Sequence, residues 1–304
     1  MSTRQIFTGP RVISAAALAR EADTSRPFAG CTLDLSVTKL APHATIDDRT
    51  HDIEELLYAL AGRGHDLIDG AREDWTEGDC VIVPAGTVHE VTNASATDEA
   101  VLLRVAAGHI WRTLGVGADG RHMSDDGDRG YEPSRAWSDL RTPGTGDRPR
   151  VVRKSGTKWE NTPDGLVRII TAAERTGVMP SAVDLYEQEI ASMTARHWHM
   201  ADELVYVVAG EGESRHWDVA ADVGDRYEAR IAEDASQWKL TPGDVAWVPQ
   251  NTVHQHVNIG HEPLRVIVAQ DRLFKMLGYD SVVYLERPRR SARAAIARSS
   301  APSR

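Results

Sequence analysis

Short apolar runs separated by turn-forming residues dominate the hydrophobic pattern of this chain. In the second half, runs rich in Leu, Ile and Val are bounded by Gly, Pro and Asn, which is typical of short β-strands. The pattern predicts strands at 166–170, 182–186, 204–208, 245–248 and 264–268. It also predicts a few short helices, one within 13–19 as a surface helix or turn and one near 131–140. We therefore expect an all-β protein.

The order of motifs in the first half is repeated in the second. The matching segments are ELLYALAG (55–62) with ELVYVVAG (203–210), and GDCVIVPAGTVH (78–89) with GDVAWVPQNTVH (243–254). A second copy of a whole motif order indicates two homologous domains. The chain length agrees, since it allows two domains of about 150 residues each.

The segment 115–156 between the copies is rich in Gly, Asp, Arg and Pro, which is typical of a linker. We predict four parts: an N-terminal domain at 1–112, a linker at 113–157, a C-terminal domain at 158–286 and a disordered Arg-rich tail at 287–304. The interval between the two motifs is longer in the second half, and we expect the extra residues, around 216–227, in a surface hairpin.

Three histidines and one glutamate of the second half have the spacing of metal ligands. His197 and His199 are alternate residues of one expected strand, so their side chains point to the same face. Glu203 follows after a short connection, and His254 comes from a later strand. Neutral imidazole with carboxylate suits a divalent first-row ion, and we expect Fe(II), with Mn, Ni, Cu and Zn as alternatives. Four ligands leave two positions open on an octahedral ion, as a catalytic site requires.

The first half carries an altered copy of this set. Its equivalent residues are His51, Glu55 and His89, but Arg49 stands opposite His197. Two histidines and a carboxylate can hold Fe(II), so a weaker second metal site is one interpretation. Arg49 carries a permanent charge and is no metal ligand. If it points inward it repels a cation and pairs with Glu55, and we therefore predict an empty, structural site.

These motifs resemble those of the cupin superfamily. The residues that carry the resemblance are His197, His199, Glu203 and Gly210 for the first motif, and Gly78, Pro84, Gly86, His89 and Asn93, or Gly243, Pro249, His254 and Asn258, for the second. Asn251 replaces the turn glycine of the second motif, and Asn tolerates the left-handed conformation. The glycine that often opens the first motif is missing from both halves. The resemblance implies two tandem cupin domains, each a jelly-roll β-barrel.

His256 is the candidate catalytic residue. It lies two positions after His254, so both side chains are expected to face the barrel interior. A titratable imidazole near a metal can orient a substrate or move protons. The alternative is a core histidine that is hydrogen-bonded to a neighbouring strand. The run 254–258 resembles the second motif of gentisate-type dioxygenases, which generally lack the glutamate of the first motif. The presence of Glu203 instead resembles quercetinase-like, acireductone-type and oxalate-type cupins, which keep that glutamate.

Three functions remain open at this stage. The first is a non-haem dioxygenase, in which a small phenolic, enolic or carboxylate substrate and dioxygen bind at adjacent positions of the metal. The second uses the metal as a Lewis acid for decarboxylation, isomerisation or lyase chemistry. The third is a binding protein that holds a small ligand without turning it over. The dioxygenase is our main expectation.

Composition and charge limit the classes of molecule that are expected as binding partners. The net charge of −10 argues against nucleic acid as a partner. The chain has no apolar run that would span a bilayer, and we expect no signal peptide. The two cysteines, Cys31 and Cys80, have no metal-type spacing and are expected as buried free thiols in a reducing cytoplasm. The expected partner is a small-molecule substrate, and a homo-oligomer is an open alternative.

Overall fold

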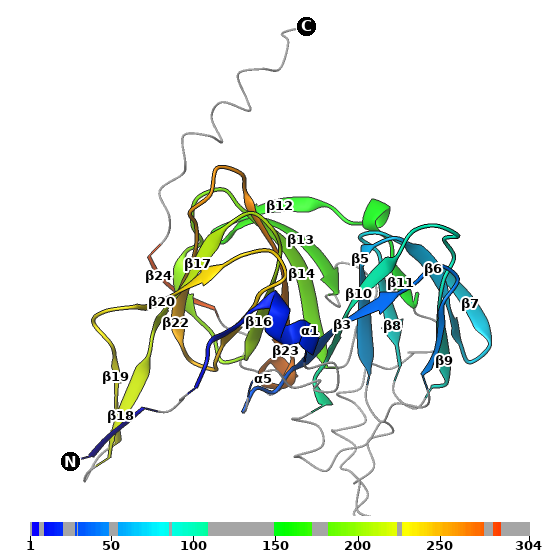
Figure 1. The fold of residues 1–304 in the computed structure, drawn as a ribbon. Coiled ribbons are helices and arrows are strands. Elements are labelled where there is room, and N and C mark those ends of the chain that lie inside the picture. Colours follow the sequence, from blue (N-terminus) through cyan, green and yellow to red (C-terminus); the bar gives the residue numbers. More distant parts are fainter. Residues whose placement is uncertain are drawn as a thin grey trace, which may run out of the picture.

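The structure is a computed structural model, and it describes most of both predicted domains. The described residues are 2–5, 9–20, 28, 30–48, 54–84, 87–108, 149–171, 182–223, 227–276 and 282–286. The helix expected near 131–140, most of the expected linker and the Arg-rich tail lie outside these residues. The described part consists of strands and a few short helical turns in two barrels, which lie side by side in Figure 1. The all-β prediction is confirmed.

The first barrel is built from two antiparallel sheets. One sheet has the strand order β11-β8-β5-β10-β3, and the other has the order β4-β9-β6-β7. The strands are β3 (Asp34–Leu40), β4 (Thr45–Asp48), β5 (Glu55–Ala61), β6 (Arg63–Ile68), β7 (Ala71–Thr76), β8 (Cys80–Val83), β9 (His89–Asn93), β10 (Ala100–Ala106) and β11 (Val151–Val152). A short 3₁₀ helix, η2 (Lys154–Gly156), follows β11.

The second barrel repeats this plan with more strands. Its sheets have the orders β12-β13-β14-β23-β16-β21-β2, where β2 is Val12–Ile13, and β20-β17-β22-β15-β24. The elements are β12 (Trp159–Thr162), β13 (Gly165–Thr171), β14 (Val183–Ile190), β15 (Arg196–Trp198), β16 (Glu203–Ala209), β17 (Gly212–Trp217), β20 (Ser236–Leu240), β21 (Val245–Val248), β22 (Val253–Asn258), β23 (Leu264–Asp271), α5 (Leu273–Met276) and β24 (Val283–Glu286). The five strands predicted from the apolar runs coincide with β13, β14, β16, β21 and β23.

The start of the chain belongs to the second barrel rather than to the first. β2 (Val12–Ile13) pairs with β21, and α1 (Ala15–Arg20) follows it. β1 (Ser2–Gln5) pairs with β18 (Val219–Val223), which forms a projecting hairpin with β19 (Tyr227–Ile231) (Figure 1). The predicted N-terminal domain, 1–112, includes these residues, although both strands pair with strands of the second half. Pairing with a distant sheet edge leaves no local mark in the sequence, and β11, inside the predicted linker, joins the first barrel in the same way.

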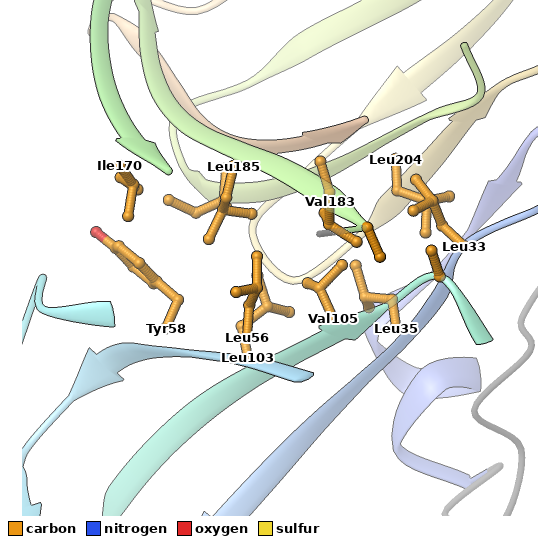
Figure 2. Packing of buried hydrophobic residues seen from close by; sticks show 14 of the residues in the cluster. Leu33, Leu35, Leu56, Tyr58, Leu103, Val105, Ile170, Val183, Leu185 and Leu204 are labelled. Carbon is orange, nitrogen blue, oxygen red and sulfur yellow. The ribbon is translucent and has the colours of Figure 1, made fainter. Parts of the chain in front are cut away.

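Strand alternation gives the seven-stranded sheet two different faces. On one face, side chains such as Leu185 and Leu204 pack against Leu56, Leu103 and other residues of the first barrel. Figure 2 shows these side chains meeting between the two sheets, and we call this cluster the inter-barrel core. The residues in between point into the second barrel, where Val205, Val268 and their neighbours form a separate cluster. One face therefore joins the barrels and the other lines an interior.

A buried ion pair lies at the edge of the inter-barrel core. Arg168 on β13 contacts Glu187 on β14 at 2.6 Å, and both side chains are almost fully buried. The Arg168 guanidinium also donates to the Tyr58 hydroxyl of the first barrel, and Arg265 donates to Glu187. A buried charge is tolerated only when it is paired and hydrogen-bonded. These bonds therefore fix the orientation of the first barrel relative to β13 and β14.

Among the described helices, none has the length and apolar character needed to cross a membrane.

The inter-barrel core is expected to dominate the stability of the whole chain. Leu103 is fully buried in it, so Leu103→Ala should lower the free energy of unfolding by about 3 kcal/mol, through lost burial and a residual cavity. Leu285→Ala is the matched control, because Leu285 is 44% exposed and should change stability by less than about 0.5 kcal/mol. Urea denaturation measures both variants. Equal effects would contradict a stabilising role for this core.

Candidate metal centre

The four predicted ligands lie together in the interior of the second barrel. β15 carries His197, with His199 directly after it, Glu203 opens β16, and β22 carries His254. His197 and His254 are paired residues of neighbouring strands. All four side chains are buried, with exposed fractions of 7% or less. One ring nitrogen from each histidine lies within 4.8 Å of those of the other two.

Backbone carbonyls fix the orientation of all three imidazoles. Nδ1 of His197 lies 3.0 Å from the carbonyl of Ala195, and Nδ1 of His199 lies 2.9 Å from that of Ala201. Nδ1 of His254 lies 2.9 Å from the carbonyl of Thr252. Because a carbonyl oxygen only accepts hydrogen bonds, Nδ1 carries a proton in each ring. Nε2 is then the nitrogen available to a ligand, as is typical of histidines that bind metals.

The turn before His254 has the conformation expected from its sequence. Asn251 has a φ of 60°, in the left-handed region where the motif usually has glycine. Its backbone N–H donates to the carbonyl of His199 at 2.9 Å. The turn thus ties the segment before β22 to the segment after β15, and it brings the ligands of the two motifs together.

Glu203 is the centre of a hydrogen-bond network. Its Oε2 accepts hydrogen bonds from Gln270 Nε2 at 2.7 Å and from the Tyr186 hydroxyl at 3.2 Å, and it lies 3.3 Å from His199 Nε2. Its Oε1 lies 3.3 Å from His256 Nε2. Burial alone would raise the pKa of Glu203, but its contacts with His199 and His256 outweigh burial and lower the pKa well below the ordinary value. Glu203 is therefore a carboxylate aimed at the imidazoles.

This donor set fits a divalent cation. His254 Nε2 is buried and has no hydrogen-bond partner among the described residues, although an unpaired buried nitrogen is costly. Burial lowers the pKa of His254 well below the ordinary value, so the ring is neutral and offers a lone pair. His254 Nε2 lies 3.8 Å from Glu203 Oε1, and His199 Nε2 lies close to the same carboxylate. A cation between these atoms would accept the lone pairs of the imidazoles and balance the charge of the carboxylate.

His256 lies next to the ligands, as the alternation of β22 predicts. Its ring centre is 5.6 Å from that of His254, and its exposed fraction is 2%. It contacts Glu203 through Nε2, while its Nδ1 is buried without a hydrogen-bond partner among the described residues. Through its ring, His256 thus contacts the glutamate at the start of β16, and its catalytic role stays a prediction. Its backbone N–H instead donates to the Thr194 hydroxyl.

Sequence reasoning missed several residues of this site. His216, expected in a surface hairpin, is fully buried on β17, and its ring centre is 6.4 Å from that of His254. Burial, followed by the charge of His256, lowers its pKa to about 3, and Ser214 Oγ lies 2.8 Å from its Nε2. Ser214 and His216 are alternate residues of β17, and this spacing could have indicated that both side chains point into the barrel. Gln270 had none, because its place beside Glu203 depends on the pairing of β23 with β16.

A cavity of about 250 Å³ opens beside the ligands. Residues of β13 and β14 line it together with His197, His199 and Glu203. Polar and ionic side chains make up much of its lining: Thr162, Asp164, Thr171, Asp184, Tyr186, Gln188, His256, Gln270, Lys275 and Tyr284. Apolar side chains such as Val167 and Ile169 complete the lining, and the volume suits a small molecule.

The equivalent residues of the first barrel are arranged differently. Arg49 and His51 lie outside the described residues, so the predicted pairing of Arg49 with Glu55 stays a prediction. Glu55 accepts a hydrogen bond from Arg104 at 2.7 Å, and Nδ1 of His89 lies 3.2 Å from both oxygens of Asp66. Within the part of the first barrel that the structure describes, no three ligating side chains converge.

Strand register explains why the Arg104 side chain lies beside Glu55. In the first barrel, Leu57 pairs with Arg104, and in the second barrel the equivalent Val205 pairs with Val268. Arg104 therefore occupies the position that corresponds to Val268 in the second barrel. Its guanidinium reaches Glu55, and both side chains are less than one-fifth exposed. A second arginine, which sequence reasoning did not single out, thus lies beside Glu55, and the empty site stays a prediction.

Two buried aspartates connect the metal centre to the segment that leads into the first barrel. Asp202 precedes Glu203, and its oxygens accept hydrogen bonds from Trp247 Nε1 and from the backbone of Thr32. Asp271 accepts from the Asp202 backbone N–H at 2.9 Å and from the Thr32 hydroxyl at 3.0 Å. Burial, followed by the charge of Asp202, raises the pKa of Asp271 from 3.8 to about 6. This pair fixes the start of β16, where Glu203 lies.

Comparison with known families agrees with this architecture. The family model described as "Cupin domain" matches residues 36–106, and the one described as "Cupin" matches residues 166–272. Each match covers one barrel. The chain belongs to the cupin superfamily, as a bicupin with two tandem jelly-roll barrels. A search of curated proteins found no match.

Several solved structures are similar to the whole chain. Lactobacillus farciminis oxalate decarboxylase, in a formate complex, is 17% identical with a TM-score of 0.60, and the similarity covers 92% of this chain and 89% of that one. A Bacillus subtilis oxalate decarboxylase deletion mutant is 18% identical with a TM-score of 0.58, over 92% and 80% of the chains. A further structure of the Bacillus enzyme, from work on its Mn(II) centres, is 19% identical with a TM-score of 0.56, over 90% and 74%. At these identities the likeness concerns the fold.

Asp271 should make the stability fall as the pH rises. Because its pKa is raised in the folded state, its contribution is fully present below pH 3.8 and is lost as the pH rises through about 6. The slope from this one group is at most about 1.4 kcal/mol per pH unit. Asp271→Asn should remove that slope, even though the lost acceptor lowers the stability itself. Urea denaturation across this pH range measures both proteins, and unchanged slopes would contradict the assignment.

Proposed function

We propose that this chain is a metal-dependent enzyme with one working site, in the second barrel. His197, His199, Glu203 and His254 would hold a divalent ion, and the cavity beside them would hold a small carboxylate substrate. The observation that carries the proposal is the convergence of three buried imidazoles whose Nδ1 atoms are occupied by carbonyls. The Glu203 carboxylate lies 3.3 Å from Nε2 of His199 and 3.8 Å from Nε2 of His254, and the cavity borders these residues.

The donor types support a divalent first-row metal, with Mn(II) and Fe(II) as the first candidates. Imidazole with carboxylate suits both ions. The sequence led us to expect Fe(II), while the Mn(II) centres described for the Bacillus subtilis oxalate decarboxylase favour manganese. The absence of thiolate among the four donors argues against a closed structural zinc site of the cysteine type.

The favoured reaction is decarboxylation or a related lyase reaction of a small carboxylate. Similarity over nearly the whole chain to oxalate decarboxylases supports this choice. When bound, the metal would supply Lewis-acid polarisation of a substrate oxygen. A dioxygenase, our main expectation from the sequence, is the second candidate, because four protein ligands leave positions where dioxygen can bind.

The side chains around the metal ligands have separate roles in this proposal. Gln270 and the Tyr186 hydroxyl hold Oε2 of Glu203, while His256 contacts Oε1, so the carboxylate cannot rotate freely. Tyr284 donates to Asp164 at 2.8 Å, and together they line the cavity near His197. His256 is the residue that we propose to position Glu203 through its Nε2 contact.

Purified protein should contain about one equivalent of metal per chain, which elemental analysis measures. His199→Ala removes one imidazole and should lower the metal content at least ten-fold after dialysis. His256→Ala should retain the metal but lower turnover by roughly 10–100-fold, because it loosens Glu203 without removing a ligand. His89→Ala is the matched control from the first barrel and should leave the metal content unchanged. Two equivalents that fall to one in His89→Ala would mean that the first barrel is loaded.

Gas exchange separates the two reactions. Metal-loaded protein is incubated with oxalate and other small carboxylates or phenols while dissolved oxygen and released carbon dioxide are recorded. The favoured reaction releases carbon dioxide without stoichiometric oxygen consumption, and His199→Ala abolishes the release. Oxygen uptake in proportion to substrate would support the dioxygenase instead. Metal loading without turnover of any candidate would favour a binding protein.

A further inference from the structure

The turn between β12 and β13 places a carboxylate beside one of the metal-ligand histidines. Oδ1 of Asp164 lies 3.5 Å from Nδ1 of His197, which is the ring nitrogen that does not bind the ion. We propose that Asp164 is a positioning residue of the metal centre, and that its charge, acting through His197, raises the affinity of the site for a divalent cation. This inference rests on the proposed function, since it concerns the same ligands.

This contact distinguishes His197 from the other two ligand histidines. In all three rings, a backbone carbonyl accepts the hydrogen bond of Nδ1. Among the described residues, the acid that contacts His199 and His254 is Glu203, and it lies on the Nε2 side of both rings. Within the part of the chain that the structure describes, the ring of His197 is therefore the one ligand ring with a carboxylate beside its outer nitrogen.

Three hydrogen bonds hold Asp164 and its turn in place. The Tyr284 hydroxyl donates to Oδ2 of Asp164 at 2.8 Å, and Tyr284 is the residue of β24 that pairs with His197 of β15. The backbone N–H of Asp164 donates to the Thr162 hydroxyl, and its backbone carbonyl accepts a hydrogen bond from Gln188. With Oδ2 bound by the tyrosine, Oδ1 is the oxygen that lies against His197.

Burial increases the electrostatic effect of this contact. Oδ1 of Asp164 is buried and has no hydrogen-bond partner among the described residues, and the His197 side chain is 8% exposed. A buried carboxylate is costly unless a positive charge or a hydrogen bond compensates it. A cation bound at Nε2 would draw electrons from the imidazole and make its Nδ1–H group more positive. The cation and Asp164 would therefore stabilise each other through the ring.

A purely structural role for Asp164 makes a different prediction. Aspartate is a common turn residue, and Asp164 also accepts the hydrogen bond of Tyr284. Asparagine suits turns as well, and its side-chain carbonyl still accepts a hydrogen bond, so Asp164→Asn removes the charge and keeps these two functions. If Asp164 were only structural, this variant would bind the metal as tightly as the wild type does.

The test measures Mn(II) binding to metal-free protein by calorimetry. We expect Asp164→Asn to weaken Mn(II) binding about ten-fold, which is typical of the loss of a group that supports a metal ligand. Glu160→Gln is the matched control, because Glu160 lies on the same hairpin and is exposed, so that its loss should leave the affinity unchanged. Unchanged affinity in Asp164→Asn, or an equal loss in Glu160→Gln, would overturn the inference.

A second measurement needs no metal. In metal-free protein with isotope-labelled histidine, NMR detects the Nδ1–H protons of the buried rings, and His197→Gln identifies the signal of His197. Asp164→Asn should shift this signal and leave those of His199 and His254 in place, whereas shifts of all three would indicate a structural role and contradict the inference.

The two measurements also separate the inference from the proposed function. If the wild type binds no metal, the proposed function fails, and the NMR comparison still decides whether Asp164 acts on the ring of His197. If the wild type binds Mn(II) but neither its affinity nor the His197 signal depends on Asp164, the inference alone fails.

Discussion

The packing of one sheet face against the first barrel is the constraint on which the rest of the structure depends. The outward residues of β14, β16 and β23, such as Leu185, Leu204 and Ile267, are fixed in the inter-barrel core. Since neighbouring residues of a strand point to opposite faces, this packing also fixes Tyr186 and Glu203 on the inner face. A shift of one residue in register would place the ligands in the apolar core. Packing against the first barrel therefore helps to fix the positions of the site residues on the inner face.

A polar interior of this kind is stable only when its groups satisfy one another. In each ligand histidine, Nδ1 is hydrogen-bonded to a backbone carbonyl two residues away, and this bond sets the orientation of the ring without a second side chain. Glu203 instead depends on side chains from three other strands, including Gln270 and His256. The imidazoles are thus fixed by local structure and the carboxylate by tertiary structure. In the proposed enzyme, changes around Glu203 tune the site, while the histidines keep their positions.

This division also explains how much the sequence could predict. The HxH spacing, the turn at Asn251 and the alternation after His254 are local features, and the structure places those side chains as expected. Gln270 and Lys275 lie far from the motifs and enter the site through strand pairing and the position of α5, which no local pattern reveals. The pairing of β2 with the second barrel was missed for the same reason. Both barrels were predictable from repeats, whereas the lining of the cavity was not.

The difference between the two barrels follows from how each one compensates a buried glutamate. In the first, the Arg104 guanidinium lies against Glu55 and supplies a permanent positive charge. In the second, the equivalent inner position is Val268, and Glu203 receives neutral donors from Gln270 and Tyr186. Neutral donors hold a carboxylate without cancelling its charge, so Glu203 keeps its attraction for a cation, while Glu55 is already neutralised. In the proposed enzyme, Glu203 therefore keeps its negative charge for a cation, whereas Arg104 already compensates the charge of Glu55.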